Sequence, residues 1–256
     1  MPETATVGGM LGSSSDPTAR IGPEIGGLIG AAADLLLPRP CPGCGRAGPW
    51  CESCAATLSG RPRRIGPPDH LADGAGLPPI WALAHYTGPV RAAILAGKEK
   101  GRRDLPPRLG EALGAAVVQL HAWGVVAEPV WLVPAPSRPA AARRRGGDPV
   151  RIMATAAARA TADAGIPAGV APCLVTLGRA RDSVGLDAAA RQQNLVGRVR
   201  LVARAAPPPD AEILLVDDVL TTGATAVAAT ATLMAAGRRP AGVIALAAVP
   251  RPVTLR

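Results

Sequence analysis

The sequence predicts an α/β fold, a parallel sheet with helices on both faces, preceded by a small cysteine-rich unit. Strand-like and helix-like segments alternate over residues 81–256, which is typical of a parallel sheet. An acidic pair and a Thr/Gly loop follow one of the expected strands, at the edge where such sheets bind ligands. The 256 residues suffice for one medium domain with an appendage.

Composition divides the chain into four parts. Residues 1–23 are rich in Gly, Ser, Pro and Thr and are expected to be disordered. Residues 24–60 are expected to form a helix and the cysteine unit. Residues 61–80, rich in proline and glycine, are expected to be a linker. The α/β domain is then expected to occupy residues 81–256.

The domain is expected to begin with a strand at 81–86 and a helix at 88–97. Pro89 suits the first position of this helix, and three apolar residues follow at helical spacing. Two prolines start a second helix at 105–121. A short apolar run at 130–133, which ends at a proline, predicts the next strand.

The second half of the domain is expected to continue this alternation. A helix is predicted at 150–164, because Gly165 and Pro167 end its pattern. Further strands are expected at 213–216 and 243–249, both apolar and rich in β-branched residues. Such strands, buried on both faces, belong in a parallel sheet.

Residues 213–225 carry the most specific functional pattern, Ile-Leu-Leu-Val-Asp-Asp-Val-Leu-Thr-Thr-Gly-Ala-Thr. Asp217 and Asp218 directly follow the expected strand, and the loop 221–225 precedes an Ala-rich helix that ends at Gly237. Backbone N–H groups at a helix N-terminus bind phosphate groups. Three Thr hydroxyls add donors, and Gly223 lets the backbone approach closely.

Two carboxylates beside a phosphate site indicate a ligand that carries neighbouring hydroxyls next to its phosphate. Ionised carboxylates are strong acceptors for such groups, and a ribose 5-phosphate has this shape. In the plainer alternative the acidic pair is only a helix cap. A cap alone does not need three Thr and a Gly in this order.

The segment resembles the signature of type I phosphoribosyltransferases, enzymes that use phosphoribosyl pyrophosphate (PRPP). The resemblance implies a type I phosphoribosyltransferase-like sheet. It also implies that the two acids bind the ribose 2- and 3-hydroxyls and that the loop binds the 5-phosphate. The residues expected to bind PRPP are Asp217, Asp218, Thr221, Thr222, Gly223, Ala224 and Thr225.

The loop after the strand at 130–133 resembles the pyrophosphate loop of the same enzymes. It leads into an Arg cluster at 143–145, and guanidinium groups pair bidentately with phosphate oxygens. The alternative is a solvated basic turn before a helix. The residues expected to hold the diphosphate are Ala135, Pro136, Ser137, Arg138 and Arg145.

Residues 177–195 resemble the mobile loop that closes over PRPP in this family. In that interpretation Arg179, Arg181 and Arg191 meet the diphosphate. Closure would exclude water from an intermediate that water hydrolyses. The alternative is a polar linker with a short helix.

Two C-x-x-C pairs near the start predict a metal site. Cys41 and Cys44 form the first pair and, after six intervening residues, Cys51 and Cys54 form the second. Four thiolates complete the tetrahedral shell of a structural Zn²⁺ and leave no open coordination position. Two disulfides would need an oxidising compartment, and no secretory signal is visible. A redox pair would need only one motif. Cys173 is left over and is expected in the core.

The order of these motifs is similar to that of the ComF family, competence-associated proteins with a zinc ribbon before a phosphoribosyltransferase domain. The resemblance covers about residues 35–250 and includes a Tyr-x-Gly-Pro segment with a Lys-Gly turn at 86–101 and an Arg-x-x-Asn at 191–194. The chain departs at 145–149, where many members have Arg-Gly-Phe-Asn-Gln. It also departs at 182–184, where many have a Gln.

The resemblance implies transfer of ribose 5-phosphate from PRPP to a nitrogen acceptor, with release of pyrophosphate. Asp217, Asp218 and Arg138 are the expected catalytic residues, and Mg²⁺ is expected with PRPP. Positioning and electrostatics would supply the catalysis, without a covalent nucleophile. The alternative is a non-catalytic PRPP- or nucleotide-binding accessory protein in DNA uptake, with single-stranded DNA or a helicase as partner.

The net charge of +9 is compatible with both interpretations. Basic residues gather at 61–64, 98–103 and 143–145, and such clusters bind a nucleic-acid backbone or a pyrophosphate equally well. The scarcity of aromatic residues, 2% of the chain, argues against a base-stacking platform. No apolar run approaches the ~20 residues of a membrane span, and a cytoplasmic location is expected.

Overall fold

The computed structural model describes residues 39–59, 61–66, 76–137, 147–177 and 197–250. The expected helix and disordered segment before residue 39 lie outside this part of the chain. The described residues form an α/β fold around a six-stranded, mostly parallel sheet of strand order β1-β2-β8-β7-β3-β4, as the sequence predicts. β1 runs antiparallel to β2, and the other neighbours are parallel.

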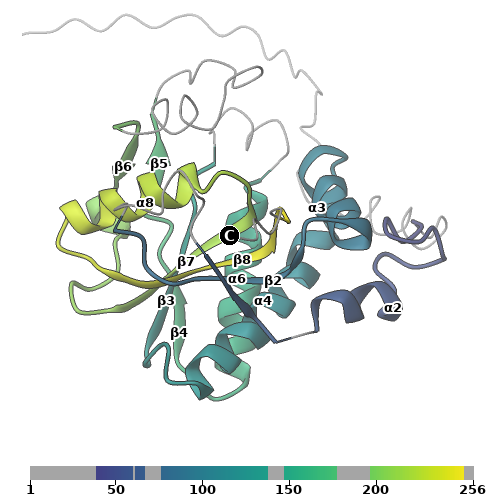
Figure 1. Ribbon diagram of the computed structural model, residues 1–256, viewed down its shortest axis with the longest axis horizontal. Coiled ribbons are helices and arrows are strands. Elements are labelled where there is room, and N and C mark those ends of the chain that lie inside the picture. The colour runs from purple at the N-terminus through teal and green to yellow at the C-terminus, as the bar shows by residue number, and fades with distance from the viewer. Residues whose placement is uncertain (1–38, 60, 67–75, 138–146, 178–196, 251–256) are drawn as a thin grey trace, which may run out of the picture. The chain divides into compact units, whose positions relative to one another are not determined.

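The strands vary widely in length, and the two longest, β7 and β8, lie side by side at the centre of the sheet (Figure 1). β5 and β6 form a separate antiparallel pair. The strands are β1 (Arg63–Ile65), β2 (Ile80–His85), β3 (Val130–Pro134), β4 (Ala168–Val170), β5 (Leu174–Thr176), β6 (Val199–Leu201), β7 (Glu212–Leu220) and β8 (Pro240–Ala248).

Most helices connect consecutive strands of the sheet. They are α2 (Glu52–Ala55), α3 (Gly88–Glu99), α4 (Leu105–Ala122), α6 (Pro149–Asp163) and α8 (Ala224–Ala235), with short 3₁₀ turns at Ala56–Leu58 and Ala203–Ala205. In the part of the chain that the structure describes, no helix is both long and apolar enough to cross a bilayer.

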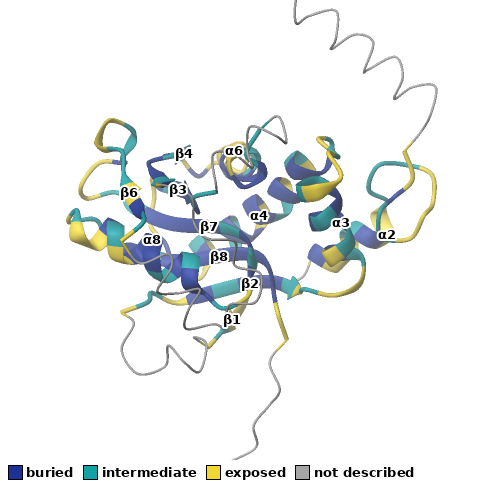
Figure 2. Cartoon of the chain, turned by 90° about the horizontal axis from the view of Figure 1, so that it is seen from above, coloured by how far each residue is buried: buried dark blue, intermediate teal, exposed yellow. Residues whose placement is uncertain are grey.

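Alternating side chains of β7 supply both cores of the molecule. Leu214 and Val216 pack with residues of α3, α4 and α6 on one face of the sheet. Ile213 and Leu215 pack on the other face with α8 and the β5–β6 pair. Figure 2 shows this arrangement, with β7 and β8 buried between the two layers. The helices therefore cover both faces of the sheet. Successive side chains along a strand point to opposite faces, so β7 contributes to the core on each side.

The helices α4 and α6 are packed unusually closely. A Cβ atom at Gly114 of α4 would lie 2.7 Å from the carbonyl oxygen of Ala157 in α6. Gly110, one turn earlier, faces the backbone of Met153 in the same way. Glycine at this spacing lets the two backbones approach, and this contact fixes α6 against the sheet.

The observed elements differ from the predicted ones in three ways. The short strands β4, β5 and β6 have no counterpart among the predicted elements. The strand expected at 213–216 continues through the acidic pair to Leu220 as β7, because its backbone stays paired with β8 as far as Ala248. The stretch 61–80, expected to be a linker, contributes the edge strand β1.

Candidate functional site

The candidate site lies where two neighbouring parallel strands end. From β3 the chain passes through α6 to β4, on one side, whereas from β7 it passes through α8 to β8, on the other. The two connections therefore diverge from adjacent strands, and α6 and α8 cover opposite faces of the sheet. In open parallel sheets such a point of divergence is where ligands bind. The loops predicted to bind phosphate and diphosphate both start here.

The acidic pair occupies the last part of β7, where Asp217 pairs with Ala245 of β8. The two carboxylates differ in their surroundings. Asp217 is half-buried, and one of its oxygens accepts a 2.8 Å hydrogen bond from the backbone N–H of Asp218. Asp218 is buried, at 4% exposure, and accepts a 2.8 Å hydrogen bond from the backbone N–H of Val219.

The surroundings of Asp217 also change its pKa. Desolvation by the surrounding protein, together with the charge of Asp218, raises the pKa of Asp217 to about 8. The ammonium group of Lys98 on α3 opposes this rise. Asp217 therefore keeps its proton to a higher pH than an ordinary aspartate. A raised carboxyl pKa in a strand-end position is a common property of functional sites.

The loop after β7 has the geometry of an anion-binding helix start. Gly223 adopts φ +72°, in the left-handed region that glycine favours, and precedes the first residue of α8. Gly223 at the N-cap has no side chain to cap the helix, but the backbone N–H of Ala224 donates a 3.4 Å hydrogen bond to Thr222 Oγ1. Thr221 is exposed, and Thr222 and Thr225 are partly exposed. The first N–H groups of a helix have no partner within it, so this turn, with its accessible Thr hydroxyls, suits an anion.

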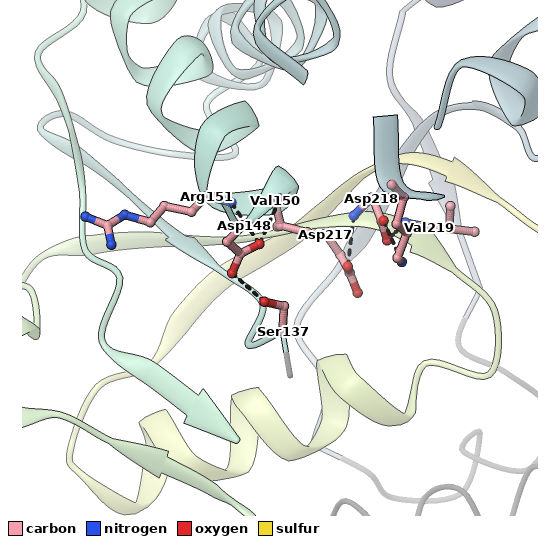
Figure 3. A network of polar contacts seen from close by, with 8 residues as sticks. Ser137, Asp148, Val150, Arg151, Asp217, Asp218 and Val219 are labelled. Carbon is pink, nitrogen blue, oxygen red and sulfur yellow. Dashed lines mark hydrogen bonds and ion pairs between the residues drawn. The ribbon is translucent and has the colours of Figure 1, made fainter. Parts of the chain in front are cut away.

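The loop after β3 is closed by a hydrogen bond between side chains. The backbone N–H of Ala135 donates to the carbonyl oxygen of Val216, which fixes the end of β3 beside β7. Ser137 Oγ donates a 2.6 Å hydrogen bond to Asp148 Oδ2. Figure 3 shows this contact together with the acidic pair on the neighbouring strand. The structure therefore brings Ala135, Pro136 and Ser137 to the same sheet edge as Asp217.

Asp148 also starts the following helix. Its Oδ1 accepts the backbone N–H of Val150 at 3.0 Å, and Pro149 occupies the first helical turn. An acidic N-cap followed by proline is a strong helix start. The departure of this chain from the ComF pattern at 145–149 thus has a structural reason at its last two residues. Arg138 and Arg145 lie outside the described residues.

The segment that resembles a mobile loop also lies outside the described residues, with Arg179, Arg181 and Arg191. Its ends are described. The backbone N–H of Leu177 donates to the carbonyl oxygen of Arg198, next to the β5–β6 pair. Thr232 of α8 donates to the carbonyl oxygen of Val199, so this pair is anchored to the helix that follows the turn Thr221–Thr225. The segment therefore leaves and rejoins the described chain beside α8.

The four cysteines of the C-x-x-C pairs are brought together. Their Sγ atoms all lie within 4.8 Å of one another. In a tetrahedron with a Zn–S distance of 2.3 Å, sulfur atoms are roughly 3.8 Å apart, so the cluster needs little adjustment to surround one ion. All five cysteines of the chain are free thiols, and Cys173 is a fully buried core residue. The cluster can therefore hold a metal ion such as Zn²⁺.

Local backbone geometry builds this cluster. The N–H of Gly45 donates to the carbonyl oxygen of Cys41, and the N–H of Ala55 donates to that of Cys51, so each pair closes its own turn. A hydrogen bond from Ser53, with help from the backbone of Cys54, lowers the pKa of Cys51 to about 6. A thiol that deprotonates readily is a better metal ligand.

Two residues at this end of the sheet, Lys98 and Asp148, are not identified from the sequence as partners of the site residues. Lys98 Nζ lies 2.7 Å from Asp218 Oδ2, although 120 residues separate them. Asp148 binds Ser137 across the loop after β3. Lys98 lies in the basic cluster 98–103 and in the segment 86–101 that resembles the ComF family, but nothing in the sequence pairs it with Asp218.

No model of a known protein family matches the chain, and no curated protein matches it. The chemistry of the site is therefore inferred from its own residues.

Proposed function

We propose that the chain is a PRPP-dependent phosphoribosyltransferase-like protein of the ComF type. It transfers ribose 5-phosphate to a nitrogen acceptor and releases pyrophosphate. One observation carries this proposal: a half-buried carboxyl group and a Thr-rich helix start with glycine at its N-cap follow each other at the end of β7, where the connections from two neighbouring parallel strands diverge. The type I phosphoribosyltransferase fold is part of the proposal.

In this proposal the phosphate of the sugar sits on the turn Thr221–Thr225. Backbone N–H groups and Thr hydroxyls donate to its oxygens, and the positive end of the α8 dipole adds to the attraction. Gly223 is required because its φ of +72° turns the chain into the helix. Asp217, a few residues before the turn, accepts from the sugar hydroxyls.

The reaction replaces one bond at the sugar C1 by another. The C1–O bond to the diphosphate breaks with its electron pair on oxygen, and the acceptor nitrogen forms the C1–N bond and loses a proton. PRPP enters as its magnesium complex. Ala135, Pro136 and Ser137 directly follow β3 at the same end of the sheet as Asp217, and they are the expected start of the diphosphate site, with Arg138 and Arg145 as further expected ligands.

The cysteine cluster has a structural function in this proposal. Four thiolates would hold Zn²⁺ without leaving a coordination position for a substrate. The metal then stabilises the turns that contain the two C-x-x-C pairs.

Pyrophosphate release from PRPP tests the proposal. Purified protein is incubated with PRPP, Mg²⁺ and a panel of nitrogen bases, and pyrophosphate is measured enzymatically. We expect release that depends on one class of base, that Asp217→Asn abolishes and that Asp210→Asn retains, because Asp210 is exposed and precedes the opposite end of β7. PRPP binding without turnover, together with salt-sensitive affinity for single-stranded DNA, would favour the accessory function instead.

A further inference from the structure

The ion pair between Lys98 and Asp218 gives the two neighbouring acids different surroundings. Lys98 Nζ lies 2.7 Å from Asp218 Oδ2, and the Asp218 side chain is 6% exposed. Asp218 Oδ1 accepts the backbone N–H of Val219. Each oxygen of Asp218 therefore already has a donor from the protein.

Asp217 is in the opposite situation. Its Oδ1 accepts the N–H of Asp218, and its carboxyl group also interacts with the carboxyl group of Asp218. Unlike Asp218, Asp217 is only partly buried. A sugar hydroxyl that approaches the end of β7 thus meets a partly exposed carboxyl group on Asp217 and a buried one, already paired with Lys98, on Asp218.

The surroundings of Asp218 explain why it needs a counter-charge. A small cavity beside it is lined mainly by apolar side chains of three helices, among them Ile94 of α3, Leu109 of α4 and Met153 of α6. Lys98 is the only other charged residue in this lining. A carboxylate buried in apolar surroundings without an opposite charge is strongly disfavoured.

The remaining groups near the pair are either neutral or already engaged. Ala245 of β8 lies next to Asp217 in the sheet, and the turn after β7 presents threonines. Asp148 precedes the first turn of α6, and its carboxylate accepts from Ser137 and from the backbone of Val150. Lys98 is therefore the cation that sets the charge of the pair among the described groups.

We propose that Lys98 is a positioning residue of the sugar-phosphate site. It neutralises Asp218 and holds that carboxylate on the α3 side of β7, so that Asp217 alone accepts the sugar hydroxyls. This inference rests on the proposed function, because it assigns the sugar contact within that site.

The inference has a consequence for proton binding. Without the ammonium group, two carboxylates at the end of β7 repel each other with no counter-charge, and Asp217 holds its proton to higher pH. Lys98 already lowers the pKa of Asp217 against burial and the charge of Asp218. A protonated Asp217 is a poorer acceptor for sugar hydroxyls.

The test compares four proteins: wild type, Lys98→Met, Lys98→Arg and Lys100→Met. The carboxyl ¹³C shift of Asp217, identified by its loss in Asp217→Asn, is followed between pH 5 and 10 without ligand. The affinity for ribose 5-phosphate is measured by calorimetry between pH 7 and 9.5. Lys100 is an exposed neighbour and serves as the matched control.

We expect the Asp217 midpoint in Lys98→Met to move up by about one pH unit or more, with affinity lost at pH 8 and recovered at higher pH. Lys98→Arg should restore the wild-type profile, and Lys100→Met should not change it. A merely structural role for Lys98 would weaken binding equally at every pH. An unchanged midpoint in a folded Lys98→Met protein would overturn the inference and leave the proposed function intact.

Two further results separate the inference from the proposed function. If the wild type does not bind ribose 5-phosphate, the function fails, and the ¹³C midpoints still decide the effect of Lys98. If Lys98→Met does not fold, Asp218→Asn and the double variant replace it. Asp218→Asn should lower the Asp217 midpoint, because a like charge is removed, and adding Lys98→Met should raise it again, because Lys98 lowers the pKa of Asp217. The double variant should fold, since it leaves no buried carboxylate without its counter-charge at position 218. An equal midpoint in Asp218→Asn and in the double variant would contradict the inference.

Discussion

Arg102 Nη1 donates a 2.9 Å hydrogen bond to the carbonyl oxygen of Pro40, the residue directly before the first metal-site cysteine. The same guanidinium donates to the carbonyl oxygen of Pro49, two residues before the second C-x-x-C pair, and to both oxygens of Asp104. One side chain thus joins both cysteine turns to the chain between α3 and α4. Since Lys98 lies near the end of α3, the cysteine unit is fixed to the helix that reaches Asp218.

Arg102→Met should therefore destabilise the protein. It removes four charge-assisted hydrogen bonds and leaves Asp104 unpaired, and hydrogen bonds to charged groups contribute about 1.5–3 kcal/mol each at most. Because these bonds act as one unit, we expect a total loss of about 3 kcal/mol in the free energy of unfolding. Urea denaturation measures it. Arg103→Met, at an exposed neighbour, should stay close to wild type, and an equal loss in both variants would contradict this account.

Metal analysis should find one zinc ion per chain, bound by the cysteine cluster. Chelation under reducing conditions should lower the melting temperature, because the two cysteine turns lose the ion that holds them. Cys44→Ser should bind zinc less tightly, and this exposed position limits damage to the core. A purified protein without metal, whose melting temperature does not respond to added zinc, would disprove the assignment.

Gly223→Ala should abolish phosphate binding as well as reduce stability. An alanine at φ +72° costs about 1–2 kcal/mol, and the strain would distort the turn on which the phosphate is proposed to sit. Gly237→Ala is the matched control, since Gly237 has φ +71° just beyond the other end of α8. Both variants should melt at lower temperature, but only Gly223→Ala should lose affinity for ribose 5-phosphate. Loss of affinity in both would assign the effect to the helix as a whole.

Asp217→Asn should stabilise the ligand-free protein at alkaline pH. An unfolded aspartate has a pKa near 3.9, whereas burial raises the pKa of Asp217 to about 8 in the fold. The folded protein therefore binds the proton more tightly, and its stability falls as the pH rises from about 4 to about 8. Asparagine does not titrate and escapes this loss.

The measurement is the melting temperature of wild type and Asp217→Asn at pH 5.5 and pH 9. The advantage of the variant should be small at pH 5.5 and larger at pH 9 by about 3 °C or more. Asp210→Asn should show no such pH dependence. A difference between wild type and Asp217→Asn that is the same at both pH values would show that Asp217 has an ordinary carboxyl pKa.

The sequence predicts the elements whose patterns are long enough to show a period. The helices at 88–97, 105–121 and 150–164 are confirmed with small shifts of their ends, because proline marks their starts and glycine or proline their ends. The strands β1, β4, β5 and β6 have three residues each. A period of two cannot be recognised in so few residues, so no pattern in the sequence predicts these strands.

Within the site, too, contiguous motifs can be predicted from the sequence, whereas contacts between residues far apart in the chain cannot. The turn at Thr221–Thr225 and the cysteine pairs are contiguous motifs, and each is visible in a short stretch of sequence. The extension of β7 through Asp217 depends on pairing with β8, and charged residues ordinarily mark the end of a buried strand. The contact of Lys98 with Asp218 joins residues that are far apart in the chain, so only the folded sheet and α3 bring it about.

Calorimetric titration with ribose 5-phosphate tests the central claim most directly, with ribose and inorganic phosphate as separate ligands at pH 8.5. The account predicts one site per chain that binds ribose 5-phosphate more tightly than either part. Asp217→Asn should reduce this affinity to that of inorganic phosphate, while Gly223→Ala abolishes both. No heat with ribose 5-phosphate, or an affinity equal to that of inorganic phosphate in the wild type, would contradict the account.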